Sequence, residues 1–221
     1  MEELLILHET EFQLLAAAFD FTKIYGIPPK ERPDEAAVMY SIHEMAEKGI
    51  LKEEGSKLRL TEPYRTAIQT MKQARRILSV NEVQEPLSNV CFYIGDIVVC
   101  LEESRQDENS VKIGTFELQE LCDQLSDREL LPDSLWPEDI QKLHARKEPA
   151  WSERQKYARF QVFVPGSNGE SEEDFYLFKI GGNYWVSEHD DEDSQCDYYD
   201  KVLFFERLWE CLNNPKREGG W

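Results

Sequence analysis

The sequence has few cations and no long apolar run. It holds 25 Lys and Arg against 44 Asp and Glu, which gives a formal charge of −19 at pH 7. Because nucleic-acid phosphates are bound by clustered cations, this balance disfavours general polyanion binding. No apolar stretch approaches the roughly 20 residues of a membrane span, so we expect no membrane-spanning helix. The first residues, Met1 to Leu4, lack the positive start of a signal peptide, and we expect a cytoplasmic protein.

Paired cysteines and phosphate-binding loops are also missing. The five cysteines include no C-x-x-C pair, and the four histidines are scattered. This spacing gives no structural metal site, and we expect reduced thiols. The patterns G-x-x-x-x-G-K-[ST], G-x-G-x-x-G and G-x-S-x-G do not occur, so no phosphate-binding loop or hydrolase nucleophile is indicated. We therefore expect no catalytic residues, no metal and no cofactor, and a protein that is not an enzyme.

Apolar and aromatic residues are plentiful, at 41% and 11%, so the chain can bury a core and is not disordered. Charge is spread unevenly, with a net of about −2 in residues 1–80 and about −17 in residues 81–221. The polar stretch 81–89 contains Pro86 and is typical of a linker. We therefore expect an N-terminal region over 1–80, a linker over 81–89 and a second region over 90–221.

The N-terminal region has the pattern of two amphipathic helices. Apolar residues three and four apart predict a helix from Phe12 that ends by Gly26. Asp34 predicts the cap of the next helix, and Gly49 lies where a helix C-cap glycine belongs. The apolar stripe of this second helix consists of Val38, Ile42, Met45 and Ala46.

A short hairpin and a further helix follow. Residues 50–51 and 58–60 predict two strands around a turn at 54–56, and Thr61 predicts the cap of a helix that includes Ile68 and Leu78. Helices followed by a hairpin and a last helix are typical of a winged helix. The run GILKEEGSKLRLTE, residues 49–62, resembles the wing of bacterial winged-helix regulators.

The charge of the second helix decides against DNA binding. In a winged helix it would enter the major groove, yet it carries one lysine against four acids: Lys48, Asp34, Glu35, Glu44 and Glu47. A winged helix that binds protein is favoured on this charge argument. A winged-helix transcriptional regulator with a C-terminal sensing or dimerisation domain is the alternative, and its DNA contacts would be Lys72, Arg75 and Arg76.

The second region contains an internal repeat. A shift of 87 residues places Gly95 on Gly182, Leu121 on Leu208 and Leu125 on Leu212. Each copy, over 90–126 and 175–214, reads as strand, tight turn, strand, acidic loop and amphipathic helix.

The residues around the second copy predict a meander of strands over 160–164, 174–180 and 183–187. The predicted fold class is therefore α+β, with a winged-helix-like segment followed by a pseudo-duplicated, mainly antiparallel sheet and flanking helices.

Two clusters in this region are candidate sites. The carboxylates of residues 188–197 surround His189; they could bind a cation, but the EF-hand spacing is absent and a hydrated surface loop is favoured. Aromatic residues outside a core would suit a protein partner with a basic, apolar helix, although they could equally plug the edge of the core. The candidate partner-binding residues are Trp136, Trp151, Tyr198 and Tyr199.

The repeated unit resembles the EspG-like chaperones of ESX (type VII) secretion. The comparison rests on residues 95–99 with 116–125, and on residues 182–186 with 204–212. The resemblance implies a cytosolic, pseudo-symmetric α+β protein that binds helical secreted substrates without catalysis. We therefore predict a non-enzymatic adaptor or chaperone, an accessory protein of type VII secretion, with a protein partner and no nucleic acid; a homodimer stays open.

Overall fold

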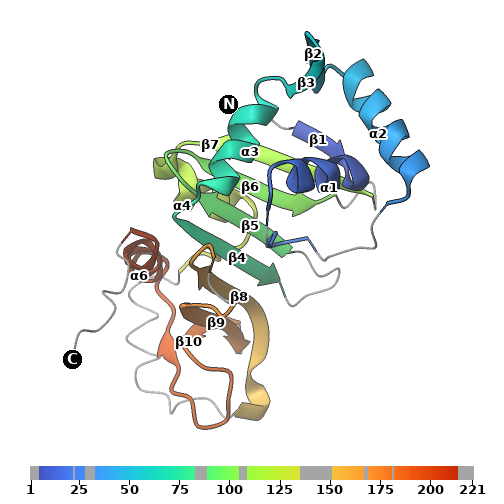
Figure 1. Cartoon of the computed structure of the whole chain (residues 1–221). Coiled ribbons are helices and arrows are strands. Elements are labelled where there is room, and N and C mark those ends of the chain that lie inside the picture. The colour runs from blue at the N-terminus through green and yellow to red at the C-terminus, as the bar shows by residue number, and fades with distance from the viewer. Residues whose placement is uncertain are drawn as a thin grey trace, which may run out of the picture. The chain divides into compact units, whose positions relative to one another are not determined.

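A computed structural model describes residues 5–21, 23–27, 33–82, 89–104, 109–134, 151–166, 169–180 and 182–213. The chain divides into two compact units (Figure 1). Unit 1 consists of Met1–Arg76 and Asn89–Leu118, and unit 2 of Ile77–Ser88 and Gln119–Trp221. This division differs from the expected regions 1–80 and 90–221, because strands after residue 89 pair with a strand at the N-terminus.

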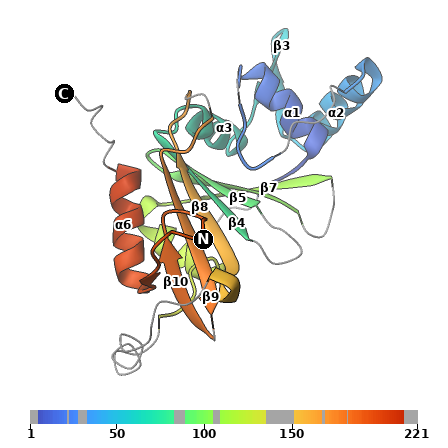
Figure 2. The same ribbon diagram turned by 90° about the horizontal axis from the view of Figure 1, so that it is seen from below.

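In the residues of unit 1 that the structure describes, four antiparallel strands form a sheet that is joined by three helices and a hairpin. Its elements are β1 (Leu5–His8), α1 (Glu9–Ala18), α2 (Glu35–Glu47), β2 (Leu51–Glu54), β3 (Lys57–Leu60), α3 (Tyr64–Lys72), β5 (Asn89–Ile94), β6 (Val98–Glu103) and β7 (Ser110–Phe116). The strand order is β1-β7-β6-β5. In Figure 2, α1 and α3 lie on one side of this sheet, with α3 against β5 and β6 and α1 against β7.

Local chemistry explains where the helices of unit 1 begin and end. The predicted cap of α2 is confirmed, because Asp34 Oδ1 accepts a hydrogen bond of 2.8 Å from Ala37 N–H. Gly49 ends this helix with φ of +71°, a left-handed conformation that favours glycine, as predicted. The first helix ends at Ala18, well before the expected Gly26, and α1 is instead set at its start by a capping box between His8 and Glu11.

The predicted wing is confirmed by the antiparallel pairing of β2 with β3. The helix after it was predicted wrongly in two respects. Thr61 does not cap α3; its hydroxyl donates to the carbonyls of Gly49 and Ile50, at 2.7 and 3.1 Å. The helix also stops at Lys72, because the following run from Arg76 forms strand β4.

Within its described residues, unit 2 has five antiparallel strands in the order β4-β8-β9-β10-β11, together with the helices α4 and α6. Its elements are β4 (Arg76–Glu82, whose first residue belongs to unit 1), α4 (Leu121–Asp127), β8 (Gln155–Phe163), β9 (Glu173–Ile180), β10 (Asn183–Ser187), β11 (Asp197–Tyr198) and α6 (Lys201–Asn213). Two short 3₁₀ helices cover Leu118–Glu120 and Trp151–Glu153. The predicted meander is confirmed as β8-β9-β10.

The two sequence repeats have the same order of elements. The first copy reads β5-β6-β7-α4 and the second β9-β10-β11-α6. Each therefore contains a strand between its acidic loop and its helix, β7 in the first copy and β11 in the second, and the sequence did not predict these two strands. Matched positions also share burial, since Leu121 with Leu208, and Leu125 with Leu212, are buried. The α+β fold class, with antiparallel sheet and flanking helices, is confirmed.

Phe204 organises the packing of α6 on unit 2. Its ring lies 5.1 Å from that of Phe160 on β8 and 5.7 Å from that of Phe175 on β9, both edge-to-face. Tyr199, just before the helix, packs on the same ring at 5.6 Å. These contacts determine which side of α6 is buried against the strands, and the other sides of the helix face away from them.

None of the helices within the described residues is long and apolar enough to cross a membrane.

Candidate functional site

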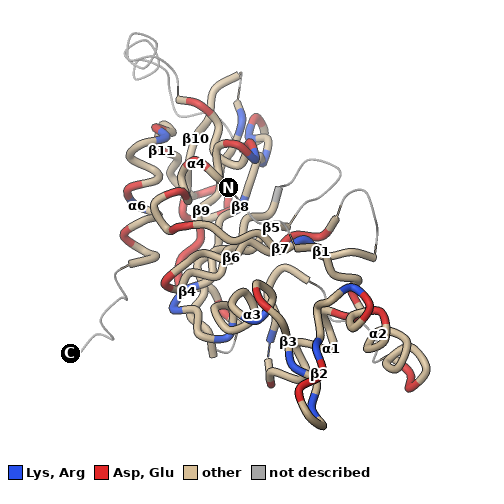
Figure 3. The backbone as a smooth tube through the Cα atoms, turned by 90° about the horizontal axis from the view of Figure 1, so that it is seen from above, with Lys and Arg blue, Asp and Glu red and all other residues tan. Residues whose placement is uncertain are grey.

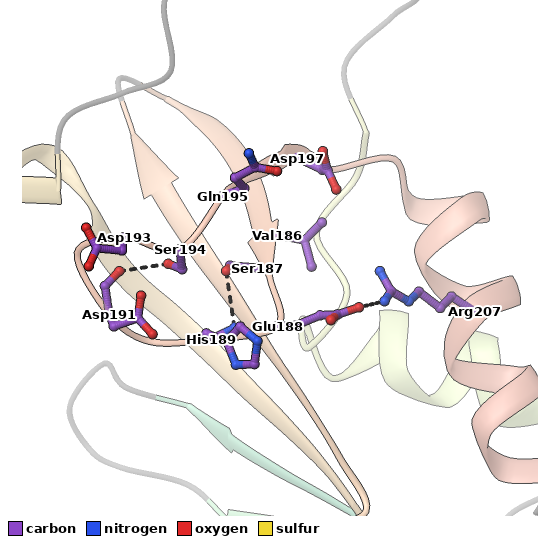
Figure 4. Close-up of a pocket in the computed structure, with 10 residues that line it drawn as sticks. All are labelled: Val186, Ser187, Glu188, His189, Asp191, Asp193, Ser194, Gln195, Asp197 and Arg207. Carbon is purple, nitrogen blue, oxygen red and sulfur yellow. Dashed lines mark hydrogen bonds and ion pairs between the residues drawn. The ribbon is translucent and has the colours of Figure 1, made fainter. Parts of the chain in front are cut away.

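A pocket of about 520 Å³ lies at the end of β10 in unit 2 (Figure 4). It is lined by the loop from β10 to β11 and by one side chain of α6. The lining residues are Val186, Ser187, Glu188, His189, Asp191, Asp193, Ser194, Gln195, Asp197 and Arg207. These include four of the carboxylates that the sequence singled out, so the structure gathers the predicted acidic cluster around one hollow.

Two buried serines hold the loop in place. Ser187 Oγ accepts a hydrogen bond of 3.2 Å from His189 N–H, and Ser194 Oγ donates one of 2.7 Å to the carbonyl of Asp191. Arg154, the residue before β8, donates from its two terminal nitrogens to Ser194 Oγ and to the Ser194 carbonyl, both at 3.0 Å. The loop is therefore anchored from the protein side, while its carboxylates lie at the surface.

The pocket is strongly negative. Arg207 of α6 forms an ion pair with Glu188 (Figure 4). Asp191, Asp193 and Asp197 are exposed, and none forms an ion pair with a described residue. Three exposed carboxylates beside one neutralised pair attract cationic groups, and water keeps each attraction modest.

The geometry gives no catalytic arrangement in this pocket. Ser187 Oγ is bound by the backbone N–H of His189 and not by its ring, so no nucleophile and base are paired there. In the part of the chain that the structure describes, no three His, Cys, Asp or Glu side chains are placed to hold a metal ion. The acidic loop therefore offers a charged surface.

Exposed apolar side chains stand beside the pocket on α6. Val202 and Leu203 expose 65% and 66% of their surface, which is unusual for large apolar residues on a helix that also has a buried side. Leu203 precedes Arg207 by four residues, so the two lie on one face of α6. Leu203 therefore lies one helical turn from Arg207, the side chain of α6 that lines the pocket.

The candidate aromatic residues are placed differently from one another. Tyr198 is half-buried, with its ring edge-to-face on Trp185 at 5.2 Å. Tyr199 is 1% exposed and donates its hydroxyl to the Pro132 carbonyl at 3.0 Å, and burial raises its pKa. The side chain of Trp151 and all of Trp136 lie outside the described residues. Of this set, only Tyr198 is placed partly at the surface.

The three candidate DNA contacts do not share one environment. Lys72 is exposed at the end of α3. Arg75 is exposed and donates to the Gly95 carbonyl at 2.8 Å, whereas Arg76 is 8% exposed and donates to the Arg75 carbonyl at 2.9 Å. Lys72 and Arg75 therefore lie at the surface of unit 1, and Arg75 also forms an ion pair of 3.9 Å with Asp96.

Sequence reasoning missed Leu203 and Arg207 as parts of this site. The signal was the surplus of apolar residues in α6, which carries more of them than its buried stripe of Phe204, Leu208 and Leu212 needs. No protein-family model matches the chain, and no curated protein matches it either.

Proposed function

We propose that this chain is a non-enzymatic protein-binding adaptor or chaperone. Its partner contributes a basic, apolar segment to the surface of unit 2. The observation that supports this most directly is the exposed Leu203, one helical turn from Arg207 of a pocket whose Asp191, Asp193 and Asp197 form no ion pair with the described residues. The site offers no paired catalytic groups, and it does offer the two kinds of contact from which reversible protein recognition is built.

The energetics favour reversible binding. Burying one leucine side chain contributes about 1.5–3 kcal/mol, and each exposed ion pair about 0.2–1 kcal/mol. The carboxylates chiefly raise the association rate and select for positive charge, while Leu203 supplies more of the affinity. Such a surface holds a partner and releases it again, which is the behaviour that an adaptor or chaperone requires.

The resemblance of the repeated unit to EspG-like proteins suggests the class of partner. A secreted protein with a helical, basic and apolar segment, bound in the cytoplasm before type VII export, fits both the resemblance and the charge of the pocket. Helical segments place apolar and cationic residues on adjacent faces at spacings of three and four. An accessory role in type VII secretion is thus the specific form of the proposal.

A winged-helix transcriptional regulator is the second candidate. The observation in its favour is the β2-β3 hairpin after α2, with Lys72 and Arg75 exposed in the same unit. The charge of α2 argues against it, since this helix contains no lysine or arginine. A gel-shift assay at physiological salt distinguishes the two: sequence-specific DNA binding that is lost on replacing Lys72, Arg75 and Arg76 would support the regulator.

The test of the adaptor uses a synthetic helical peptide made only of leucine and lysine, with the leucines on one face. The variant D191N/D193N/D197N should weaken binding about tenfold, because it removes three attractive charges worth about 0.2–1 kcal/mol each. Leu203→Ser should weaken it by a similar factor through the lost apolar contact. A titration of photo-crosslinks between the peptide and residues 186–207, quantified by mass spectrometry, measures both affinities at this pocket.

A matched control separates the pocket from the overall charge. The variant D20N/E53Q/D127N removes three exposed carboxylates elsewhere, so it changes the net charge equally. It should retain affinity within about twofold. A binding site at this pocket would be contradicted if the two triple variants weakened binding equally. It would also be contradicted if neither D191N/D193N/D197N nor Leu203→Ser weakened binding.

A further inference from the structure

Helix α2 in unit 1 turns an apolar side to solvent. Met39 and Tyr40 expose 62% and 65% of their surface, whereas Ser41 and Met45 of the same helix are buried. The exposed side continues along the helix at spacings of three and four residues. It is made of Ala36, Met39, Tyr40, His43 and Ala46, called here the outer face of α2.

The buried side of α2 accounts for how the helix is held. It packs against α1 and against the wing strand β2. Lys48, the residue after the helix, donates to Glu11 Oε1 of α1 at 2.7 Å. The helix is therefore supported from one side only, and its outer face is not needed to attach it to unit 1.

The charged residues of α2 itself are all acidic. Glu35 and Glu47 lie exposed at the two ends of the helix, and Glu44 is half-buried between them. Within α2 there is no Lys or Arg, as Figure 3 shows by its tan and red colouring over most of the helix. Lys48, the residue directly after the helix, is paired with Glu11.

We propose that the outer face of α2 is a docking surface for an amphipathic helix of a partner protein, which presents apolar side chains flanked by Lys or Arg. The two large side chains stand among small ones, since Ala36 and Ala46 let a second helix approach to the usual ~8–10 Å between axes. Apolar residues at alternating spacings of three and four are the pattern that helices use to pack against each other.

The acidic residues of α2 favour a basic partner helix over two other occupants, a second copy of the chain and a nucleic acid. A second copy of the chain would bring its own Glu35, Glu44 and Glu47 against the same residues, and like charges in contact disfavour that pairing. Nucleic acid needs cations at the surface, and α2 provides none. A helix with lysines or arginines beside its apolar residues meets the acidic borders favourably. This inference is independent of the acidic pocket and of the function proposed from it.

The experiment maps where a helical probe binds. The probe is the leucine–lysine peptide with a benzophenone group on its apolar face, photo-crosslinked to the full chain and analysed by mass spectrometry. Crosslinks are expected within Glu35–Glu47. The variant M39S/Y40S should reduce them at least about fivefold, whereas M39L/Y40F, which keeps the apolar surface, should retain them.

Controls separate this surface from the pocket of unit 2. Leu203→Ser should leave the crosslinks to α2 unchanged, even though it weakens the pocket in unit 2. A peptide with glutamate in place of lysine should crosslink at least about fivefold less. Crosslinks to α2 that persist in M39S/Y40S, or that form equally with the glutamate peptide, would overturn the proposal.

Sedimentation tests whether a second copy of the chain, and not a partner helix, binds the outer face of α2. The wild type and M39S/Y40S should sediment alike, because the outer face of α2 does not join two copies. A dimer in the wild type that M39S/Y40S dissociates would assign this face to a second copy and overturn the proposal. DNA binding that is lost in M39S/Y40S would overturn it as well.

Discussion

Tyr93 satisfies two backbone groups in the core of unit 1. Its hydroxyl donates to the Tyr25 carbonyl at 3.0 Å and accepts from the Tyr25 N–H at 2.9 Å, and both contacts are buried. Tyr93→Phe removes the hydroxyl that serves both groups and should lower the free energy of unfolding by about 1–3 kcal/mol. Urea denaturation measures this loss. Tyr40→Phe, at an exposed tyrosine, should change stability by no more than about 0.5 kcal/mol, and an equal loss in both variants would contradict the role of Tyr93.

Alkaline pH should destabilise the protein through its buried tyrosines. Burial raises the pKa of Tyr93 well above its ordinary value of 10.0, and burial likewise raises the pKa of Tyr199. The unfolded chain therefore loses these protons first as pH rises. Stability is fully present below pH 10 and falls above it, by up to about 1.4 kcal/mol per pH unit for each such tyrosine.

Urea unfolding at a series of pH values above 9 measures this dependence. Tyr93→Phe carries one buried phenol fewer, so its stability should fall less steeply with pH than that of the wild type. Parallel slopes in the two proteins would show that Tyr93 does not contribute. The loss of the hydrogen bonds of Tyr93 already lowers the stability of Tyr93→Phe at neutral pH. The loss of its ionisation changes only the pH dependence above pH 9, so the same measurements separate the two effects.

At the scale of single residues, the sequence predicted local chemistry better than long-range partners. Asp34 and Gly49 act within one or two turns of their own helix, and both were predicted correctly. Thr61 was predicted as a cap, but its hydroxyl contacts residues that are 11 and 12 positions away. Leu203 was missed because an exposed leucine and a buried one look the same in the sequence.

A buried carboxylate joins two helices of unit 1. Glu11 of α1 is 1% exposed, and its two oxygens accept from His8 N–H and from Lys48 Nζ, each at 2.7 Å. Glu11→Ala removes a charged acceptor that closes the capping box of α1 and contacts the end of α2. It should lower the free energy of unfolding by about 1.5–3 kcal/mol, as measured by urea denaturation.

An exposed ion pair provides the control for this joint. Glu54 pairs with Arg59 at 3.0 Å on the wing, where both side chains are more than half exposed. Glu54→Ala should cost less than about 1 kcal/mol, because water screens the pair. If Glu11→Ala were no more destabilising than Glu54→Ala, the buried carboxylate would not be the joint between α1 and α2.

Helices and strands could be predicted where the apolar residues recur at a single spacing, either that of a strand or that of a helix. The wing and the β8-β9-β10 meander alternate or are bounded by turn residues, and both were found as predicted. Strand β4 was taken for the end of a helix, because Ile77, Leu78 and Val80 are all buried and such a run fits either period. Its β-branched residues and its pairing with β8 decide for a strand, and that pairing spans some 80 residues.

At the scale of the whole chain, the sequence repeat and the compact units divide the protein differently. The first repeat contributes its strands to unit 1 and its helix to unit 2. A sequence comparison detects the repeat because side-chain patterns are shared, but it cannot show which strands pair. The pairing of β1 with β7, which ties residues after 89 to the N-terminus, was therefore not predictable from the linker-like stretch 81–89.

The net charge of −19 should make stability and binding respond to salt in opposite directions. Raising NaCl from about 20 mM to about 500 mM shortens the screening length to a few ångströms. Repulsion among surplus carboxylates then weakens, so the free energy of unfolding should rise by roughly 1 kcal/mol. The same screening should weaken binding of the leucine–lysine peptide, because its lysines are attracted by those carboxylates. Urea denaturation and fluorescence anisotropy measure the two responses.

The variant D191N/D193N/D197N tests whether the acidic pocket is the source of the binding response. Its affinity for the peptide should depend less on salt than that of the wild type, while its stability should still rise with salt, since most of the net charge remains. Binding that strengthens with salt in the wild type would mean that apolar contact alone holds the peptide. In that case Leu203 would carry the recognition and the carboxylates beside it would only keep the surface hydrated.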